Sequence, residues 1–380
     1  MSRKIIPIAL LLSLATLPVG AAGPEAPIQP APELRLGANA ATEPPASVTP
    51  TALAAREASL AGVDQAAECK SGKGDASCRR VYVQAEALFW DRIGTGCDQL
   101  LAFDSYTNEA LLNTNDLEFD YEPGLRVLVG WQPDPCRGCG WCSAWELSYF
   151  GVYDWSASAA AVGANTLMFP GDAGLAWNNF GLYDELRAVY DSELHNVEMN
   201  CVKSCCFDCG TRIDFLCGFR FLALLEDLSL IGTDLQEGTS SYDVSTENYL
   251  YGLQFGGRLR RSWQRWAVEL TGKAGVFLND ASQSQMTTDF PDEADPNVVR
   301  ALIGSDEQSV AALGEIGVTL IRPITDVWSL RIGYQALGIG GLALAPNQLD
   351  FTDTFTSGSE LHKDGWIFLH GVNVGVEANW

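Results

Sequence analysis

The sequence predicts an all-β fold, an antiparallel transmembrane β-barrel of the outer membrane with about 10 to 14 strands and long loops. Three observations predict it. Apolar and polar residues alternate over many segments of about ten residues, the N-terminus has the pattern of a secretory signal peptide, and aromatic residues recur at the ends of the alternating segments. No later run of about 18 apolar residues occurs, so the sequence predicts no transmembrane helix.

The first 79 residues are predicted to lie outside the barrel. Arg3 and Lys4 precede an apolar run over 5–17 and small residues at 20–22, so 1–22 reads as a signal peptide. Residues 23–79 are rich in Pro and Ala and have too few large apolar residues to bury a core. They are predicted to form a flexible extension, and the barrel domain is predicted over 80–380.

Ten segments are predicted as strands because their side chains alternate with the period of two that β-structure requires. In 212–226, for example, Phe215 and Phe219 fall on one face, whereas Arg220 and Glu226 fall on the other. The same alternation occurs, in chain order, in 80–90, 122–131, 143–153, 185–199, 212–226, 247–261, 264–278, 308–322, 325–337 and 366–380. Weaker strands in the long gaps would raise the total toward 14.

Tryptophans at the ends of these segments indicate a membrane barrel, because such barrels carry aromatic girdles at both membrane interfaces. The tryptophans concerned are Trp90, Trp131, Trp145, Trp266, Trp328, Trp366 and Trp380. The alternative from the same pattern is a secreted β-sandwich with ordinary core aromatics.

Polar side chains on the face opposite the apolar one are predicted to line a wet lumen. The candidates are Arg80, Gln84, Glu86, Glu146, Glu198, Arg212, Arg220, Glu226, Gln254, Glu269, Lys273, Glu315, Arg331, Gln335 and Glu377. Their seven acidic residues exceed their five basic ones, so a channel is predicted to prefer cations weakly. The alternative is an ion-pair network that plugs a narrow barrel, because small barrels fill with side chains.

The last predicted strand, "HGVNVGVEANW" over 370–380, matches the terminal strand that barrel-assembly machinery recognises. That pattern sets a polar residue, a glycine, an apolar residue and a terminal aromatic in fixed register, and Asn373, Gly375, Ala378 and Trp380 occupy it. The expected partners are therefore this machinery and outer-membrane lipid. The net charge of −24 argues against nucleic acid as a partner.

Several segments also carry a family resemblance. They are "YVQAEALFW" (82–90), "SELHNVEMN" (192–200), "GFRFLALLED" (218–227), "NYLYGLQFG" (248–256), "GEIGVTL" (314–320), "GYQALGIGGLALAPNQL" (333–349) and the terminal "HGVNVGVEANW". Over about 80–380 the chain resembles the putative beta-barrel porin-7 family of planctomycete bacteria. The resemblance implies an outer-membrane barrel; the family's own function is inferred.

The chain has 11 cysteines, most of them in two clusters that are predicted to lie in turns or loops. The disulfide candidates are Cys136, Cys139, Cys142, Cys201, Cys205, Cys206 and Cys209. An oxidising compartment favours disulfides, and paired CxxC spacing leaves a zinc or iron–sulfur site as the alternative. Cys217 lies on the apolar face of its strand and is predicted to be a buried thiol.

Signals for catalysis are weak, since the chain has three histidines and no nucleophile elbow, HExxH motif or phosphate loop. No enzymatic activity and no cofactor are predicted. The leading function is passive diffusion of small polar solutes across the outer membrane. The alternatives are a non-conducting structural or surface-display barrel with Cys-rich loops, and a secreted β-sandwich that binds a ligand.

Overall fold

The computed structural model describes residues 80–94, 96–132, 142–170, 182–208, 210–235, 238–288, 303–352 and 357–380. The predicted signal peptide (1–22) and extension (23–79) lie outside the described residues. The strands are β1 (Arg80–Ile93), β2 (Leu100–Asp104), β3 (Ala110–Asn113), β4 (Glu122–Gln132), β5 (Cys142–Met168), β6 (Tyr183–Asp208), β7 (Thr211–Asp234), β8 (Gly238–Ser262), β9 (Ala267–Thr288), β10 (Ile303–Pro323), β11 (Trp328–Leu342) and β12 (Gly365–Asn379). Two 3₁₀ turns, η2 (Thr114–Asp116) and η3 (Ala345–Gln348), complete the described elements, and no helix in this part of the chain is long and apolar enough to cross a membrane.

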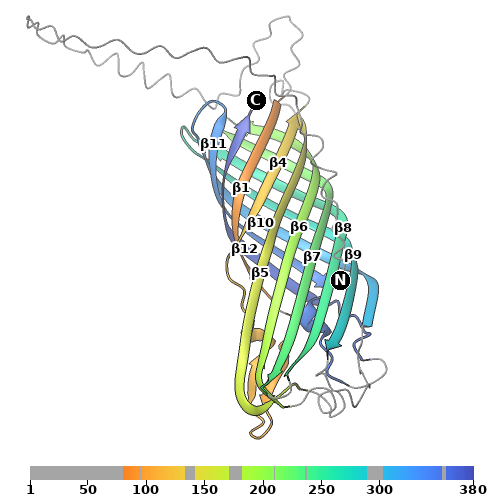
Figure 1. Ribbon diagram of the computed structural model, residues 1–380. Coiled ribbons are helices and arrows are strands. Elements are labelled where there is room, and N and C mark those ends of the chain that lie inside the picture. The colour runs from red at the N-terminus through yellow and green to blue at the C-terminus, as the bar shows by residue number, and fades with distance from the viewer. Residues whose placement is uncertain are drawn as a thin grey trace, which may run out of the picture. The chain divides into compact units, whose positions relative to one another are not determined.

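The strands form one antiparallel sheet that closes into a ring (Figure 1). Each ring strand pairs with its neighbours in the order β1, β4, β5, β6, β7, β8, β9, β10, β11, β12, and β12 pairs with β1 to close the ring. The short strands β2 and β3 form a hairpin that joins the far end of β5. The predicted antiparallel barrel is confirmed. Each of the ten predicted segments overlaps one ring strand, whereas β2 and β3 are too short to show an alternation.

Strands β5 to β10 are much longer than a membrane crossing requires. They contain between 21 and 27 residues, whereas β1, β4, β11 and β12 contain between 11 and 15. A tilted membrane strand needs about 9–11 residues. The long strands therefore run on past the short ones and form a column that continues from one end of the ring (Figure 1).

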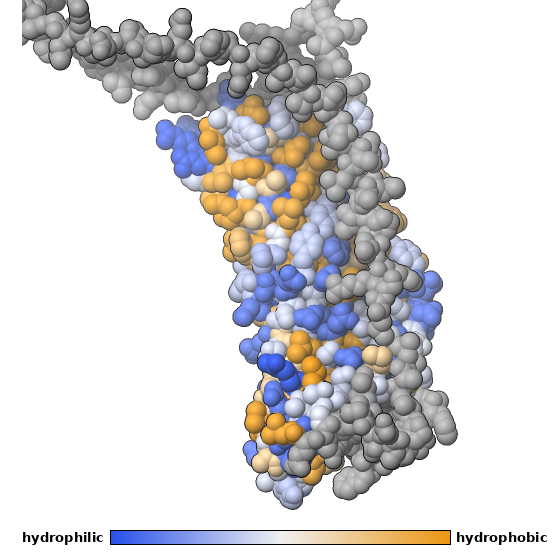
Figure 2. All heavy atoms as spheres, viewed as in Figure 1, coloured by the Kyte–Doolittle hydropathy of each residue, from blue (hydrophilic) through white to orange (hydrophobic). Residues whose placement is uncertain are grey.

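A belt of exposed hydrophobic side chains surrounds the end of the ring nearer Trp380. On the face drawn in Figure 2, hydrophobic residues gather there, and a hydrophilic band follows. Members of the belt include Phe89, Leu125, Val129, Leu147, Met199, Phe215, Phe219, Leu253, Phe255, Leu270, Val276, Ile316, Val318, Ile332, Val372, Val374 and Val376. Such side chains gain nothing from water, so this surface is built for an apolar environment.

Aromatic side chains lie along both edges of the belt. Exposed tryptophans at the edge nearer Trp380 are Trp131, Trp145, Trp266 and Trp328. At the other edge the Tyr149 hydroxyl lies 3.0 Å from His195 Nδ1, and the Tyr334 hydroxyl lies 2.9 Å from His370 Nδ1. Trp90 is not a member, contrary to the prediction, because its position on β1 faces inward, where it is fully buried against Phe150.

The interior of the ring has two levels of different chemistry. Along β1 the inward positions change from Gln84 and Glu86 to Leu88 and Trp90. Ion pairs fill the level inside the belt, and a hydrophobic core fills the column. Its fully buried members include Trp155, Tyr190, Leu194, Leu224, Leu228, Leu250 and Leu337. The expected wet lumen is therefore replaced, in the column, by an apolar interior.

The connection between β11 and β12 enters this core. Residues 343–352 and 357–361, here called the inserted segment, include Leu344, Ala345 and Leu349, which are buried in the core. Asn248 of β8 bonds the backbone N–H and C=O of Ala343, both at 2.8 Å. Gln285 Nε2 of β9 donates to the Gln348 carbonyl at 2.6 Å. The wall strands thus hold the inserted segment through its backbone.

The seam between β1 and β12 requires a glycine at Gly371. A Cβ at this position would lie 2.0 Å from the Phe89 carbonyl oxygen and 2.8 Å from Trp90 Cα. Because both are backbone atoms of β1, relief requires the strands to separate. Gly371→Ala is expected to lower the free energy of unfolding by about 1–3 kcal/mol or more, measured by urea unfolding in lipid vesicles.

Gly314→Ala on β10 is the matched control, because a Cβ there meets nothing within 4 Å. It is expected to leave stability unchanged or raise it by about 0.5–1 kcal/mol, since alanine has less conformational freedom to lose. Equal losses from the two variants would contradict the argument that close packing at the seam is responsible.

Candidate functional site: the barrel interior

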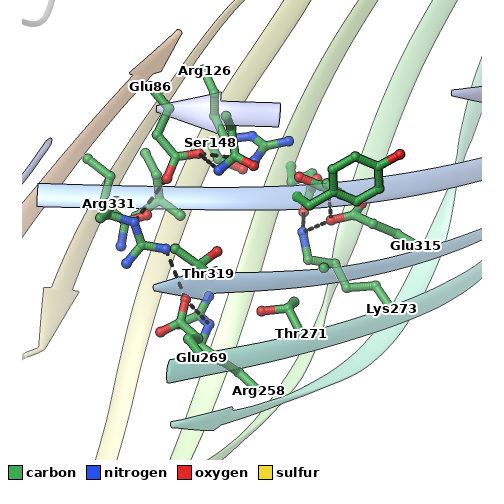
Figure 3. A pocket seen from close by; sticks show the side chains of 17 residues that line it. Glu86, Arg126, Ser148, Arg258, Glu269, Thr271, Lys273, Glu315, Thr319 and Arg331 are labelled. Atoms are coloured by element: carbon green, nitrogen blue, oxygen red, sulfur yellow. Dashed lines mark hydrogen bonds and ion pairs between the residues drawn. The ribbon is translucent and has the colours of Figure 1, made fainter. Parts of the chain in front are cut away.

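Arg331 of β11 is the hub of the ion pairs nearest the seam. Its guanidinium lies 2.9 Å from Glu86 of β1, 2.9 Å from Glu269 of β9 and 2.7 Å from Glu377 of β12. All four side chains are buried, and those of Arg331, Glu86 and Glu269 point toward one another inside the ring (Figure 3). Arg126 of β4 adds a contact of 3.2 Å to Glu86. Arg331 therefore links its own strand, β11, to β1, β9 and β12.

A second group lies on the wall formed by β6 to β10. Lys273 Nζ lies 3.0 Å from Glu198 and 3.1 Å from Glu315. Arg220, which is fully buried, contacts Glu315 at 2.8 Å and Glu198 at 3.6 Å. Gln254 Nε2 donates to Glu198 at 2.8 Å. Two cations and two carboxylates form a compact square in which every charge has two opposite neighbours.

A third group lies nearer the rim at Trp380. Arg258 makes two contacts to Glu146, at 2.9 and 3.0 Å, in the bidentate geometry that arginine favours. The Tyr82 hydroxyl donates to the same carboxylate at 2.6 Å. Arg212 lies 2.6 Å from Asp214, which also lies 3.6 Å from Arg258. Arg258 also lies 3.9 Å from Glu269, so it joins this group to the ion pairs of Arg331.

One further pair lies apart, at the entrance to the hydrophobic core. Arg92 is bound to Glu226 and accompanied by the Tyr190 hydroxyl at 2.9 Å. Its guanidinium carbon lies 4.8 Å from the Phe119 ring and 5.3 Å from the Tyr190 ring, which is cation–π geometry. Burial raises the pKa of Tyr190 well above its ordinary value, so its hydroxyl stays neutral.

The structure places all but one of the predicted interior residues with their side chains inside the ring. The exception is Arg80, whose side chain lies outside the described residues. Most of the others take part in the three ion-pair groups, and Glu226 takes part in the separate pair. The glutamines bond to the same groups, since Gln84 Nε2 donates to Glu377 at 3.2 Å and Gln335 Nε2 donates to Glu315 at 2.6 Å.

The interior ion pairs contain residues that are not among the predicted lumen residues. They are Arg92, Arg126, Asp214, Arg258 and Arg260, of which Asp214 falls on the polar face of the predicted strand 212–226. Arg258 and Arg260 follow Gln254 and Gly256 at steps of two, so the alternation already assigned them to the inward face. Arg126 was hidden because its neighbours in β4 do not alternate cleanly.

The charges that form ion pairs inside the described part of the ring balance one another. Eight carboxylates (Glu86, Glu146, Glu198, Asp214, Glu226, Glu269, Glu315 and Glu377) face eight cations (Arg92, Arg126, Arg212, Arg220, Arg258, Arg260, Lys273 and Arg331), and each takes part in an ion pair. The acidic excess of two, on which weak cation preference was predicted, is absent from this set because most of the missed residues are arginines.

Little space remains between these side chains. The cavity inside the network has a volume of about 70 Å³ and is lined by Glu86, Glu198, Arg258, Lys273 and Arg331, among others. A site of about 10–15 Å³ is enough for one water, so the cavity has room for several water molecules.

The four residues of the predicted assembly signal lie on β12 and just beyond it. Asn373 Nδ2 donates to Glu86 at 3.0 Å, so this residue also serves the ion network. Gly375 passes close to β1, and Ala378 is buried between β1 and β11. Trp380 pairs with Val81 through its backbone N–H, at 2.9 Å, and its ring is exposed at the rim.

The cysteine predictions need correction at the positions that are described. Cys201 and Cys205 carry free thiols and lie within β6 rather than in a loop, because the ladder to β7 continues past both. Cys217 faces outward and is exposed, not buried. Cys136, Cys139 and Cys209 lie outside the described residues, as do the side chains of Cys142 and Cys206. No group of three or more metal-binding side chains occurs among the residues searched, which are those described.

Comparison with known proteins identifies the family. A model of the putative beta barrel porin-7 family matches residues 185–380, just over half of the chain. The chain belongs to this family. As a porin-7 protein with a closed antiparallel ring, it is located in the outer membrane. The hydrophobic belt is accordingly its lipid-facing surface. No curated protein matches the sequence.

Among solved structures the porin-7 chain is similar to other outer-membrane barrels. The outer membrane protease OmpT from Escherichia coli has 9% identity and a TM-score of 0.45, covering 79% of this chain and 97% of its own. A major outer membrane protein from Thermus thermophilus has 11% identity, a TM-score of 0.30, and coverages of 80% and 99%. The translocator domain of the autotransporter NalP from Neisseria meningitidis has 12% identity, a TM-score of 0.32, and coverages of 86% and 96%. These likenesses assign no activity.

Proposed function

We propose that the protein is a non-enzymatic outer-membrane barrel whose interior is closed to solutes and which carries a rigid column of strands beyond the membrane. The observation that carries the proposal is the filled interior, where paired charges occupy one level and an apolar core occupies the next. A solute crossing the barrel would have to displace both.

The ion-pair level opposes conduction because its charged side chains already form ion pairs with one another. Arg331 and Arg220 each contact at least two carboxylates and are almost fully buried. Removing one partner of a buried pair costs about 3–5 kcal/mol, so a passing ion would meet a large barrier at each group.

The apolar level opposes conduction for a different reason. The inserted segment and the inward side chains of β5 to β9 pack into one core that includes Trp155, Leu224 and Leu344. Ions do not enter a dewetted apolar constriction, because they would lose their hydration there without replacement.

The column is the part of the closed barrel that would be displayed outside the membrane. In outer-membrane barrels the turns at the periplasmic end are short and the opposite loops are long. The connection between β6 and β7 is short and lies at the same end as Trp380. The column is therefore assigned to the cell exterior, where the proposed role is structural or surface display.

The competing proposal is passive diffusion of small polar solutes with weak cation preference. The family description favours it. Under this proposal the inserted segment would have to leave the core, and the Arg331 and Arg220 groups would have to separate. The balanced interior charge removes the original basis for selectivity, so diffusion of this kind would discriminate little between ions.

Conductance in planar lipid bilayers separates the two proposals. The full-length protein, with insertion verified by its heat-dependent shift in gel mobility, is expected to give no steady current steps above the lipid background. Liposomes that contain it are expected to swell in small sugars no faster than empty ones. Reproducible steps together with sugar uptake would overturn the closed-barrel proposal and establish diffusion.

A further inference from the structure

The sheet of the column has an open edge at β10. This strand pairs with β9 from Ile303 to Ile321. Its ladder to β11, in contrast, begins only at Ala312. Residues 303–311 therefore have β9 on one side, and no strand of the described chain pairs with them on the other.

The direction of the backbone groups along this edge follows from one close approach. A Cβ at Gly341 would lie 2.6 Å from the Val310 carbonyl oxygen, so this carbonyl points toward the β11 side. Backbone groups alternate in direction along an antiparallel strand, so Gln308, Asp306 and Gly304 direct their N–H and C=O groups the same way. None of the three forms a backbone hydrogen bond on that side within the described chain. The residues between them bond to β9 instead.

Solvent reaches this edge. Asp306, Glu307 and Gln308 are all exposed, although successive side chains of a strand point to opposite faces. Exposure of both faces, together with unpaired backbone groups, is the arrangement that accepts an added strand from another chain. In such a pairing the main-chain hydrogen bonds supply affinity, and the side chains at alternate positions supply specificity.

The charges at the edge define the kind of strand that fits. Asp306 is exposed on the outer face, as is Asp280, which lies opposite Gln308 on β9. Neither carboxylate forms an ion pair within the described part of the chain, whereas Glu307 is paired with Lys363. Asp306 would be a direct neighbour of the added strand, and Asp280 would add negative potential one strand farther away. Basic side chains at alternate positions would therefore be attracted, and acidic ones would be repelled.

We propose that the edge of β10 at 303–308 binds an extended cationic segment of another protein by strand addition, with its basic side chains beside Asp306. The inference rests on the proposed display role of the column only for the location of this partner, which would lie outside the cell. The open edge is independent of conduction, so peptide binding and conductance decide the two proposals separately.

Hydrogen exchange of the detergent-solubilised full-length protein, resolved to single amides, tests the strand addition. The probe is a peptide that alternates threonine and lysine, and a peptide that alternates threonine and glutamate is the control. The lysine peptide is expected to slow exchange at Gly304, Asp306 and Gln308 by at least about tenfold. Exchange at Ser305 and Glu307 is expected to stay unchanged, because these residues already bond to β9.

Gln308→Pro tests the backbone contribution, because it removes an N–H that points to the open side, where an edge strand tolerates proline. It is expected to weaken binding of the lysine peptide at least about tenfold, measured by fluorescence anisotropy. Gln308→Ala keeps the N–H and is expected to bind as the wild type does. Asp306→Asn is expected to weaken binding about two- to fivefold and to reduce its salt dependence. The heat-dependent shift in gel mobility verifies that each variant is folded, and the exchange experiment needs no variant.

Equal binding of the lysine and glutamate peptides would overturn the proposal, as would unchanged exchange at all three amides. The acidic edge would then serve only to keep the edges of separate molecules from pairing. Equal binding by Gln308→Pro and Gln308→Ala would also overturn it, because backbone hydrogen bonds would not be responsible. A dimer in the wild type that Gln308→Pro converts to monomers would assign the edge to a second copy of the chain instead.

Discussion

Arg331→Met is expected to lower the free energy of unfolding by about 3–5 kcal/mol, the cost of removing one partner from a buried ion pair. Arg331 contacts Glu86, Glu269 and Glu377 within 2.9 Å, so its loss leaves three carboxylates close together without their shared cation. Methionine keeps most of the side-chain volume, so the loss reports charge more than packing. Urea unfolding of the protein in lipid vesicles, followed by tryptophan fluorescence, measures it.

Arg322→Met is the matched control, because the same change is made on an exposed arginine. The guanidinium carbon of Arg322 lies 4.8 Å from the Trp266 ring, an exposed cation–π contact worth about 0.5–1 kcal/mol. Arg331→Lys keeps the charge but not the planar fork and is expected to fall between the two methionine variants. Similar losses for Arg331→Met and Arg322→Met would mean that the interior is wet enough to solvate the carboxylates.

The ring could be predicted from the sequence because every strand of a barrel carries the same alternation of inward and outward residues. Inward and outward positions alternate at every residue. The faces on which Phe215 and Arg220 lie can therefore be predicted without knowledge of the neighbouring strands. For the same reason the interior positions of Glu86, Glu198 and Arg331 followed from single segments. The ring order needed only the rule that consecutive antiparallel strands are neighbours.

The contents of the ring could not be predicted in the same way. Which carboxylate meets which arginine depends on register across the barrel, and Arg331 reaches Glu86 across 245 positions of sequence. The change from a polar to an apolar interior is present in the sequence of β1, where Leu88 and Trp90 follow Glu86 on the inward face. The position of Trp90 at the end of its predicted strand nevertheless predicted an aromatic residue at the membrane interface. The sequence after β11 does not by itself predict that this connection enters the core. The residues that hydrogen-bond to it, Asn248 and Gln285, lie on other strands.

Trp155→Ala is expected to lower the free energy of unfolding by about 3–5 kcal/mol, the usual cost of removing a large aromatic side chain from a packed core. Trp155 is fully buried in the part of β5 that extends past the belt, and its indole N–H donates to the Trp90 carbonyl at 3.2 Å. Its removal would open a cavity where the column joins the membrane level. The same unfolding measurement applies, with hydrogen exchange to locate the effect in β5 and β6.

Trp366→Ala on β12 is the control, since Trp366 is 58% exposed and its loss is expected to cost about 1 kcal/mol or less. The comparison bears directly on function. If the interior of the column is packed, the two variants should differ by several kcal/mol, and hydrogen exchange should quicken in β5 and β6 only for Trp155→Ala. If they cost the same, water must already surround Trp155 in the folded protein. A water-filled column would remove the apolar barrier on which the closed-barrel proposal depends, and passive diffusion would become the better account.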